Sequence, residues 1–235
     1  MTSPADRLIV ALDGEPNEME ILVGRLRGVG VNFFKLGIDA LLQPRGRALA
    51  DGIASFPGFS LFLDLKLYDT RDTVDRTVRR AFDLGARFVT VHATPSVMEA
   101  AMRTKPSGDR CKVLAVGPTS DQSYESYNRW LENAPIELCD GVVCPAAFVH
   151  RWASYLRCHD KIVVCPGVRP LTLARDPGGF EYIDERPDDH ATVTSPRLAI
   201  EQGAGFLVVG RPICAAPDPV AAARAILAEI EGAIT

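Results

Sequence analysis

The sequence lacks a long hydrophobic run, a marked net charge and an export signal, and each absence excludes a class of protein. No apolar run approaches the ~20 residues that a helix needs to cross a bilayer. The net charge is −4 and the Lys and Arg residues are scattered, which argues against a nucleic-acid surface. Residues 1–7 lack the basic and apolar regions of a signal peptide, and the chain is expected to enter a strand at once. We therefore expect a cytoplasmic protein with neither a membrane nor a nucleic-acid partner.

Cysteine and histidine patterns typical of metal centres are also missing. The six cysteines include no CxxC pair, and the four histidines are not spaced with them as zinc ligands. Most of the cysteines lie in or beside apolar stretches, where they are expected to be buried apolar side chains or free thiols. We predict no metal site.

What the sequence does contain is a short apolar run that alternates with a helical pattern eight times. The predicted strands are Leu8–Leu12, Phe33–Gly37, Leu61–Leu67, Phe88–His92, Val113–Val116, Gly141–Cys144, Ile162–Val164 and Phe206–Val209. The predicted helices are Asn17–Gly28, Leu41–Ala54, Asp72–Leu84, Ser96–Arg103, Tyr124–Glu132, Phe148–Leu156, Pro196–Gln202 and Pro219–Ile230. Continuous Val, Ile and Leu runs of this kind indicate a parallel sheet covered by helices.

Eight strand–helix units in 235 residues predict an α/β protein with one domain over residues 1–235, a (β/α)8 TIM barrel. A doubly wound open sheet is the alternative, weakened because no GxGxxG follows the first strand. The segment at about 170–194 has no regular pattern until its end. A loop this long in a compact barrel is usually a lid or a disordered excursion, and its place beside Arg211 favours a lid over phosphate.

Polar residues gather where the predicted strands end, which is the rim that carries the active site in such barrels. Two adjacent strands contribute charges to otherwise apolar runs: Lys35 on one, Asp64 and Lys66 on the next. Asp64 and Lys66 are two apart and so project from the same face of their strand, and Asp69 follows in the loop. Buried charges are costly unless they pair. The alternatives are a structural ion pair and a catalytic set, and the shared rim favours the catalytic set.

The same rim also receives residues from the other strands. These are Asp13, His92, Thr119, Ser120, Pro145, Arg169, Gly210 and Arg211. The backbone at Gly210 and the guanidinium of Arg211 suit a phosphate, because glycine permits close approach and guanidinium binds bidentately. A turn carrying a surface arginine is the alternative. His92 is interpreted as a support for the site or as a core histidine.

These motifs together resemble the orotidine 5′-phosphate decarboxylase family over nearly the whole chain. The matching stretches are Ala11–Asp13, Phe34–Gly37, the Asp64-x-Lys66-xx-Asp69-xxx-Thr73-Val74 pattern, Thr119-Ser120, Pro166–Pro170 and Val209–Pro212. A sugar-phosphate branch, which includes the 3-keto-gulonate-phosphate decarboxylases, shares the bare DxKxxD. The Thr73-Val74 continuation and the Thr119-Ser120 pair favour the orotidylate branch.

The resemblance implies a cofactor-independent decarboxylase that converts orotidine 5′-monophosphate to UMP. Asp13 and Lys35 would hold ribose hydroxyls, Asp64 would face the substrate carboxylate and Lys66 would protonate C6. Thr119 and Ser120 would contact the pyrimidine. Gly210 and Arg211 would bind the 5′-phosphate, helped by Pro166 and a lid residue. Asp69 and Thr73 would reach into the neighbouring subunit's site of a homodimer.

The chain departs from the family pattern at a few positions. Thr70-Arg71 stands where the family usually has Ile-Pro, and His190 stands where the lid usually carries a glutamine. Two other functions therefore stay open. One is an enzyme of the same fold acting on a modified pyrimidine nucleotide or on a sugar phosphate with a divalent metal. The other is a non-catalytic barrel that binds a nucleotide.

Overall fold

Eight parallel strands form a closed barrel in the order β1 to β8, with β8 paired to β1. The computed structural model describes residues 3–108, 111–118, 123–170 and 194–234. The strands are β1 Leu8–Ala11, β2 Phe33–Gly37, β3 Ser60–Leu67, β4 Ala86–His92, β5 Lys112–Val116, β6 Gly141–Val143, β7 Ile162–Pro166 and β8 Phe206–Val209. The predicted TIM barrel is confirmed, and closure of the sheet excludes the open doubly wound alternative.

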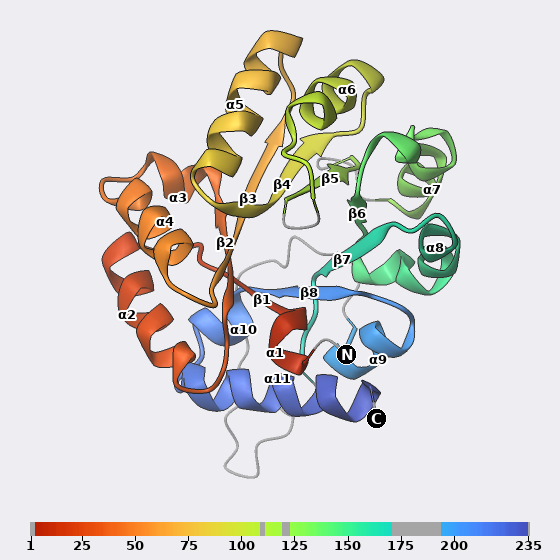
Figure 1. Ribbon diagram of the computed structural model, residues 1–235. Helices are drawn as coiled ribbons and strands as arrows, with labels where there is room; N and C mark the ends of the chain where they lie inside the picture. The colour runs from red at the N-terminus through yellow and green to blue at the C-terminus, as the bar shows by residue number, and fades with distance from the viewer. Residues whose placement is uncertain (1–2, 109–110, 119–122, 171–193, 235) are drawn as a thin grey trace.

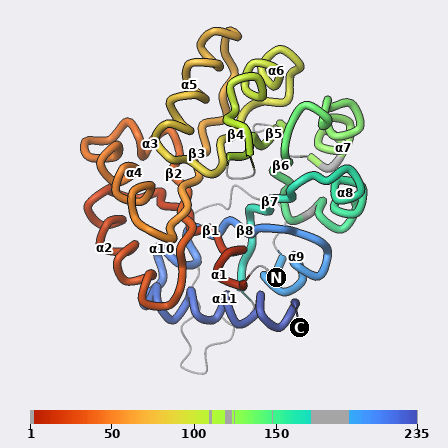
Figure 2. Tube along the Cα trace, in the orientation of Figure 1, coloured from red at the N-terminus to blue at the C-terminus, as the bar shows by residue number. Residues whose placement is uncertain are grey.

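The helices surround this barrel on its outside (Figure 1). They are α1 Pro4–Arg7, α2 Pro16–Arg27, α3 Ile38–Leu42, α4 Gly46–Ser55, α5 Arg71–Asp83, α6 Pro95–Thr104, α7 Tyr124–Asn133, the 3-10 turn η1 Ile136–Leu138, α8 Ala146–Cys158, α9 Pro196–Glu201, α10 Arg211–Cys214 and α11 Pro219–Ile234. Figure 2 traces the chain around the ring, with the first helix lying beside α11, which it contacts.

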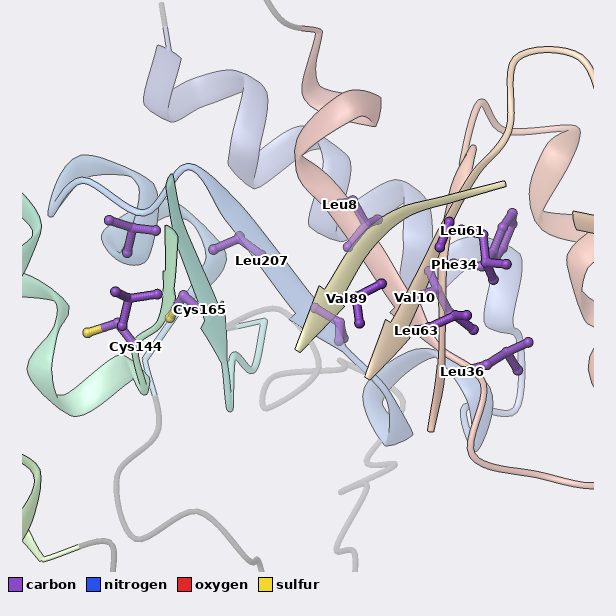
Figure 3. Packing of buried hydrophobic residues seen from close by; sticks show 14 of the residues in the cluster. Leu8, Val10, Phe34, Leu36, Leu61, Leu63, Val89, Cys144, Cys165 and Leu207 are labelled. Carbon is purple, nitrogen blue, oxygen red and sulfur yellow. The ribbon is translucent and has the colours of Figure 1, made fainter. Parts of the chain in front are cut away.

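Side chains along each strand alternate between two apolar layers, as the pleat requires. The outward-facing layer packs against the helices, and Figure 3 shows Leu8 and Val10 of β1 with Leu61 and Leu63 of β3 in this layer. The inward-facing layer fills the barrel. It consists of Ile9, Ala11, Phe33, Phe62, Phe88, Leu114, Val164 and Val208.

Three phenylalanine rings, on β2, β3 and β4, pack together in the inward-facing layer. The Phe33 and Phe88 rings have centroids 5.0 Å apart, and those of Phe62 and Phe88 are 5.8 Å apart. The next inward position on each strand, toward its carboxyl end, is two residues later. On three neighbouring strands this position is polar: Lys35 on β2, Asp64 on β3 and Thr90 on β4. The period of two therefore sets a polar group directly above the aromatic layer.

The helix expected over Leu41–Ala54 is wrong in one respect, because the structure divides it into α3 and α4. Pro44 causes the break: the residue before a proline is driven out of the helical region, and Gln43 is extended with ψ of 151°. The chain turns back so tightly that a Cβ on Gly46 would lie 1.8 Å from the Ala40 carbonyl oxygen. Only glycine fits there.

The amino terminus also differs from expectation. Instead of entering β1 directly, the chain forms the short helix α1 first. Ser3 and Asp6 make a capping box, in which the Ser3 hydroxyl accepts from the Asp6 N–H and the Asp6 carboxylate accepts from the Ser3 N–H. The first-turn proline and this cap form a helix start that the sequence interpretation missed.

Candidate active site

A cavity of about 410 Å³ opens at the carboxyl ends of the strands. It brings together most of the residues predicted for the site. Those that line it are Asp13, Lys35, Asp64, Lys66, Pro145, Pro166, Arg169, Gly210 and Arg211. Val116, Tyr127, Val143 and Val164 supply an apolar wall opposite the charges. The cavity thus has the apolar lining with a few convergent polar groups that is typical of a small-molecule site.

Two ammonium groups share one carboxylate in this cavity. Lys66 Nζ donates to Asp64 Oδ2 at 2.6 Å, and Lys35 Nζ lies 3.4 Å from the same oxygen. Lys35 also lies 3.5 Å from Asp13 Oδ1. The Lys35 and Asp64 side chains are each only 12% exposed, whereas that of Lys66 is 43% exposed. Of the three charges that meet at Asp64, Lys66 is therefore the most exposed to the open cavity.

The electrostatics keep Asp64 ionised. Burial by itself raises the pKa of this carboxyl group, but the positive charges of Lys35 and Lys66 lower it. Hydrogen bonds from Lys66 and Thr90 add to their effect, and the pKa of Asp64 ends below its ordinary value. Asp64 is an anion that holds two cations near it, and it is not poised to give or take a proton near neutral pH.

The strand is not regular where Lys66 lies. Lys66 has φ of +46°, a left-handed conformation that is uncommon outside glycine, and the β3–β4 register shifts between Leu63 and Leu67. The simple alternation predicted for Leu61–Leu67 therefore ends at Asp64. The Asp64 and Lys66 side chains still meet, but through a distorted backbone and not through the pleat of a straight strand.

Thr90 belongs to this network, although the sequence interpretation did not select it. It is fully buried on β4, its hydroxyl donates to Asp64 Oδ1 at 2.8 Å, and it accepts from the Lys66 backbone N–H at 3.0 Å. A usable signal was present, because Thr90 is a polar residue two positions after the inward-facing Phe88 in an apolar run.

Gly210 and Arg211 also line the cavity, where β8 ends. Arg211 begins the short helix α10, so the segment is a helix start and not the plain turn that was the alternative. A Cβ on Gly210 would touch Asp13 Oδ2 at 3.5 Å, so the backbone there lies close to the end of β1. The Cys214 thiol donates to the Ala11 carbonyl at 3.1 Å and ties α10 to β1.

Asp69 and Thr73 do not lie in the lining of this cavity. Asp69 is exposed just beyond β3, where its carboxylate accepts from the Thr70 N–H at 2.7 Å. That bond, followed by a hydrogen bond from Thr73, lowers the pKa of Asp69. The Thr70 hydroxyl donates to the Thr73 hydroxyl at 3.1 Å. Within one chain these residues form a separate small network at the start of α5.

The remaining predicted residues are placed as follows. His92 packs its ring against Tyr68 at 5.7 Å, and burial followed by the charge of Lys66 lowers its pKa. Thr119, Ser120 and His190 lie outside the described residues, as does most of the predicted lid. The two ends of that segment meet, because the Arg169 N–H donates to the Thr194 carbonyl at 2.9 Å.

In the part of the chain that the structure describes, no group of three or more His, Cys, Asp or Glu residues is arranged to hold a metal ion. No helix there is both long enough and apolar enough to cross a membrane.

The closed parallel barrel and its charged cavity at the carboxyl rim define a TIM-barrel enzyme site. Residues 6–226 match the sequence model of the orotidine 5′-phosphate decarboxylase / HUMPS family. The chain belongs to this family, which confirms the resemblance found in the sequence.

Named relatives agree with this assignment. The chain is 37% identical to an orotidine 5′-phosphate decarboxylase of Methylobacterium sp. (strain 4-46), over 97% of each chain. It is 38% identical to that of Methylobacterium nodulans, over 98% of each. The crystal structure of the Lactobacillus acidophilus orotidine 5′-phosphate decarboxylase matches with a TM-score of 0.69 and 27% identity, over 96% of this chain and 99% of that one. The Pyrococcus horikoshii structure has a TM-score of 0.70 at 23% identity and shares the fold.

Proposed function

We propose that this protein decarboxylates orotidine 5′-monophosphate to UMP in pyrimidine biosynthesis, without a cofactor. The observation that carries the proposal is the Lys35–Asp64–Lys66 network in the cavity, which Arg211 also lines. A site that only bound a nucleotide would have no need for two ammonium groups on one buried carboxylate, which is costly to bury. A decarboxylase does need a fixed cation there.

The chemistry explains that need. Loss of carbon dioxide breaks the bond to C6 and leaves an electron pair on that carbon, with no cofactor to accept it. A fixed ammonium beside C6 stabilises the developing negative charge and then gives up a proton to form the new C–H bond. Lys66 is proposed for this role because it is the more exposed of the two lysines that contact Asp64. Asp64 holds the Lys66 ammonium in place.

The other lining residues are proposed to bind the rest of the nucleotide. Asp13 and Lys35 suit the ribose hydroxyls, since they offer an acceptor and a donor 3.5 Å apart. The guanidinium of Arg211 and the close-lying backbone at Gly210 suit the 5′-phosphate, with Pro166 beside them. Contacts to a remote phosphate supply binding energy that can be used to organise the reacting end.

Three further residues keep roles that rest on the family resemblance. Thr119 and Ser120 are proposed to contact the pyrimidine, and His190 to contact phosphate from the segment 171–193. A lid role for that segment stays a prediction from the sequence. We also propose a cytoplasmic location, which the six free cysteines support because disulfides are rare in reducing compartments.

We further propose a homodimer in which Asp69 and Thr73 complete the partner's site. Neither residue lines the cavity of its own chain. Large apolar side chains that follow β2 and β3 at the same rim are exposed: Leu42 at 80% and Ile38 at 56% on α3, and Tyr68 at 71% after β3. An exposed apolar patch beside an active site is typical of a subunit interface.

The sugar-phosphate branch of the family is the second candidate. The curated relatives that match this chain almost end to end bear the name orotidine 5′-phosphate decarboxylase, which favours the first proposal. The two candidates also differ in chemistry, because the sugar-phosphate enzymes require a divalent metal according to the family resemblance. Activity that survives a chelator therefore separates them.

The test is ultraviolet-monitored loss of orotidine 5′-monophosphate by the purified protein in the presence of EDTA. We expect turnover by the wild type and none detectable by Lys66→Ala. Lys112→Ala is the matched control, since it removes an ammonium at the start of β5, away from the rim. A wild-type protein that binds UMP but never consumes orotidine 5′-monophosphate would contradict the proposal.

A further inference from the structure

We infer that Thr90 is a positioning residue for the reacting pair, Asp64 and Lys66. This inference rests on the proposed decarboxylase activity and concerns the same site. Thr90 does not line the cavity and is fully buried. The Thr90 hydroxyl contacts both members of the pair: it binds the side chain of Asp64 and the backbone N–H of Lys66.

The first contact sets the rotation of the Asp64 carboxylate. A threonine hydroxyl has one proton to donate, and that proton goes to Asp64 Oδ1 at 2.8 Å. The other oxygen, Oδ2, is then the one that receives Lys66 at 2.6 Å and Lys35 at 3.4 Å. Thr90 and the two lysines thus divide the carboxylate between them, which leaves it one orientation.

The second contact holds the backbone of Lys66. The β3–β4 register is shifted between Leu63 and Leu67, so the regular ladder between these strands is interrupted where Lys66 lies. Its N–H would otherwise need another acceptor, and the Thr90 hydroxyl provides one at 3.0 Å. This bond supports the left-handed conformation of Lys66, with φ of +46°.

Both contacts depend on the same hydroxyl oxygen. The hydroxyl accepts from the Lys66 backbone while donating to the carboxylate that the Lys66 ammonium contacts. Its removal would free the carboxylate to rotate and the backbone to relax, so the ammonium would leave its position beside the reacting carbon. A displacement of about 1 Å in a reacting group can lower a rate by about 100-fold.

The test compares two pairs of proteins, and the members of each pair differ only in this hydroxyl. The first pair is the wild type and Thr90→Val. Thr90→Val keeps the shape of the wild-type side chain, and Thr90→Ser and Thr90→Ala form a second pair that both lack the methyl group. We expect Thr90→Val to lower kcat by about 10- to 100-fold relative to wild type, and Thr90→Ala to do the same relative to Thr90→Ser. KM and the Kd for UMP should change by less than about threefold, because phosphate and ribose contacts remain.

Counting active sites by UMP titration separates positioning from folding. The matched control is Thr104→Val on α6, since that hydroxyl contacts the Asp75 carboxylate and the Ala100 carbonyl outside the site. Thr104→Val should lower Tm and leave kcat per site unchanged. The inference is overturned if Thr90→Val and Thr90→Ala keep kcat per site, or if they lose activity only in proportion to lost UMP sites. A wild type without turnover would instead contradict the proposed function itself.

Discussion

The ammonium of Lys66 lies 2.6 Å from the Asp64 carboxylate, although Lys66 has a left-handed backbone with φ of +46°. For a residue other than glycine this conformation costs roughly 1–2 kcal/mol. It persists because surrounding contacts hold it, here the ion pair and the backbone hydrogen bond to Thr90. Backbone strain at a proposed proton donor is consistent with a site whose geometry is set before the substrate arrives.

The first prediction concerns the pH dependence of stability. The folded pKa of Asp64 is lowered from 3.8, so its contribution to stability is present above that pH and is lost as the pH falls through the folded pKa. Asp64→Asn leaves two ammonium groups facing a neutral amide. We expect it to lower the free energy of unfolding by about 1–3 kcal/mol at neutral pH.

The difference in the free energy of unfolding between the wild type and Asp64→Asn should shrink in acid, where the wild-type carboxyl group is itself neutral. Denaturant unfolding of both proteins from about pH 7 to about pH 3 measures it. A difference that stays constant, or grows, as the pH falls below 3.8 would contradict the assigned direction of the pKa.

The second prediction concerns phosphate binding. Arg211→Ala should weaken UMP binding by about 10- to 100-fold, because a charge-assisted hydrogen bond is worth about 1.5–3 kcal/mol. Uridine, which lacks the phosphate, should bind the variant and the wild type equally. Calorimetric titration with both ligands is the measurement, and Arg47→Ala, on the outer helix α4, is the control. Equal weakening of uridine and UMP would assign Arg211 another role.

The third prediction concerns Thr70, where the family usually has isoleucine. Its hydroxyl donates to Thr73 at 3.1 Å, so Thr70→Val should disturb the pair proposed to serve the partner's site. We expect kcat/KM to fall by about fivefold, the value of one ordinary hydrogen bond, and Thr70→Ser to restore it.

Arg71, which follows Thr70 in the sequence, supplies the control for the Thr70→Val variant. Arg71 pairs with Glu99 on the surface, where both side chains are about half exposed. Such pairs contribute little, so Arg71→Ala should leave kcat/KM unchanged. If Thr70→Val has the kinetics of the wild type, the Thr70–Thr73 contact has no part in the reaction.

The fourth prediction concerns assembly. Leu42→Asp places a charge in the exposed apolar patch on α3 and should shift the proposed dimer toward monomer. Activity should then fall most at low protein concentration, because each site would lose the partner's Asp69 and Thr73. Sedimentation velocity and kcat over a range of concentrations measure both effects.

Ile21→Asp is the matched control for assembly, since Ile21 is 68% exposed on α2. It should leave both the sedimentation coefficient and the activity unchanged. A wild-type protein that is monomeric and fully active would contradict the shared site.

Much of this protein follows directly from its amino-acid order. Strand positions and the eightfold repeat depend on local apolar runs, and these runs predicted the barrel, its closure and the rim on which Asp13, Lys35, Asp64 and Arg211 meet. Parallel strands in a barrel all point their carboxyl ends to one side, so knowing which residue ends each strand is enough to gather the rim residues.

The contacts that side chains make between strands could not be predicted from the local sequence. The partner of Lys66 on β4, the shifted register beside it and the division of the Asp64 oxygens all depend on how β3 and β4 lie against each other. Thr90 is 24 and 26 residues from the groups it contacts, so no local pattern pairs it with them. Local sequence sets which way a side chain faces, whereas the register between strands, a property of the whole packed barrel, sets what that side chain meets.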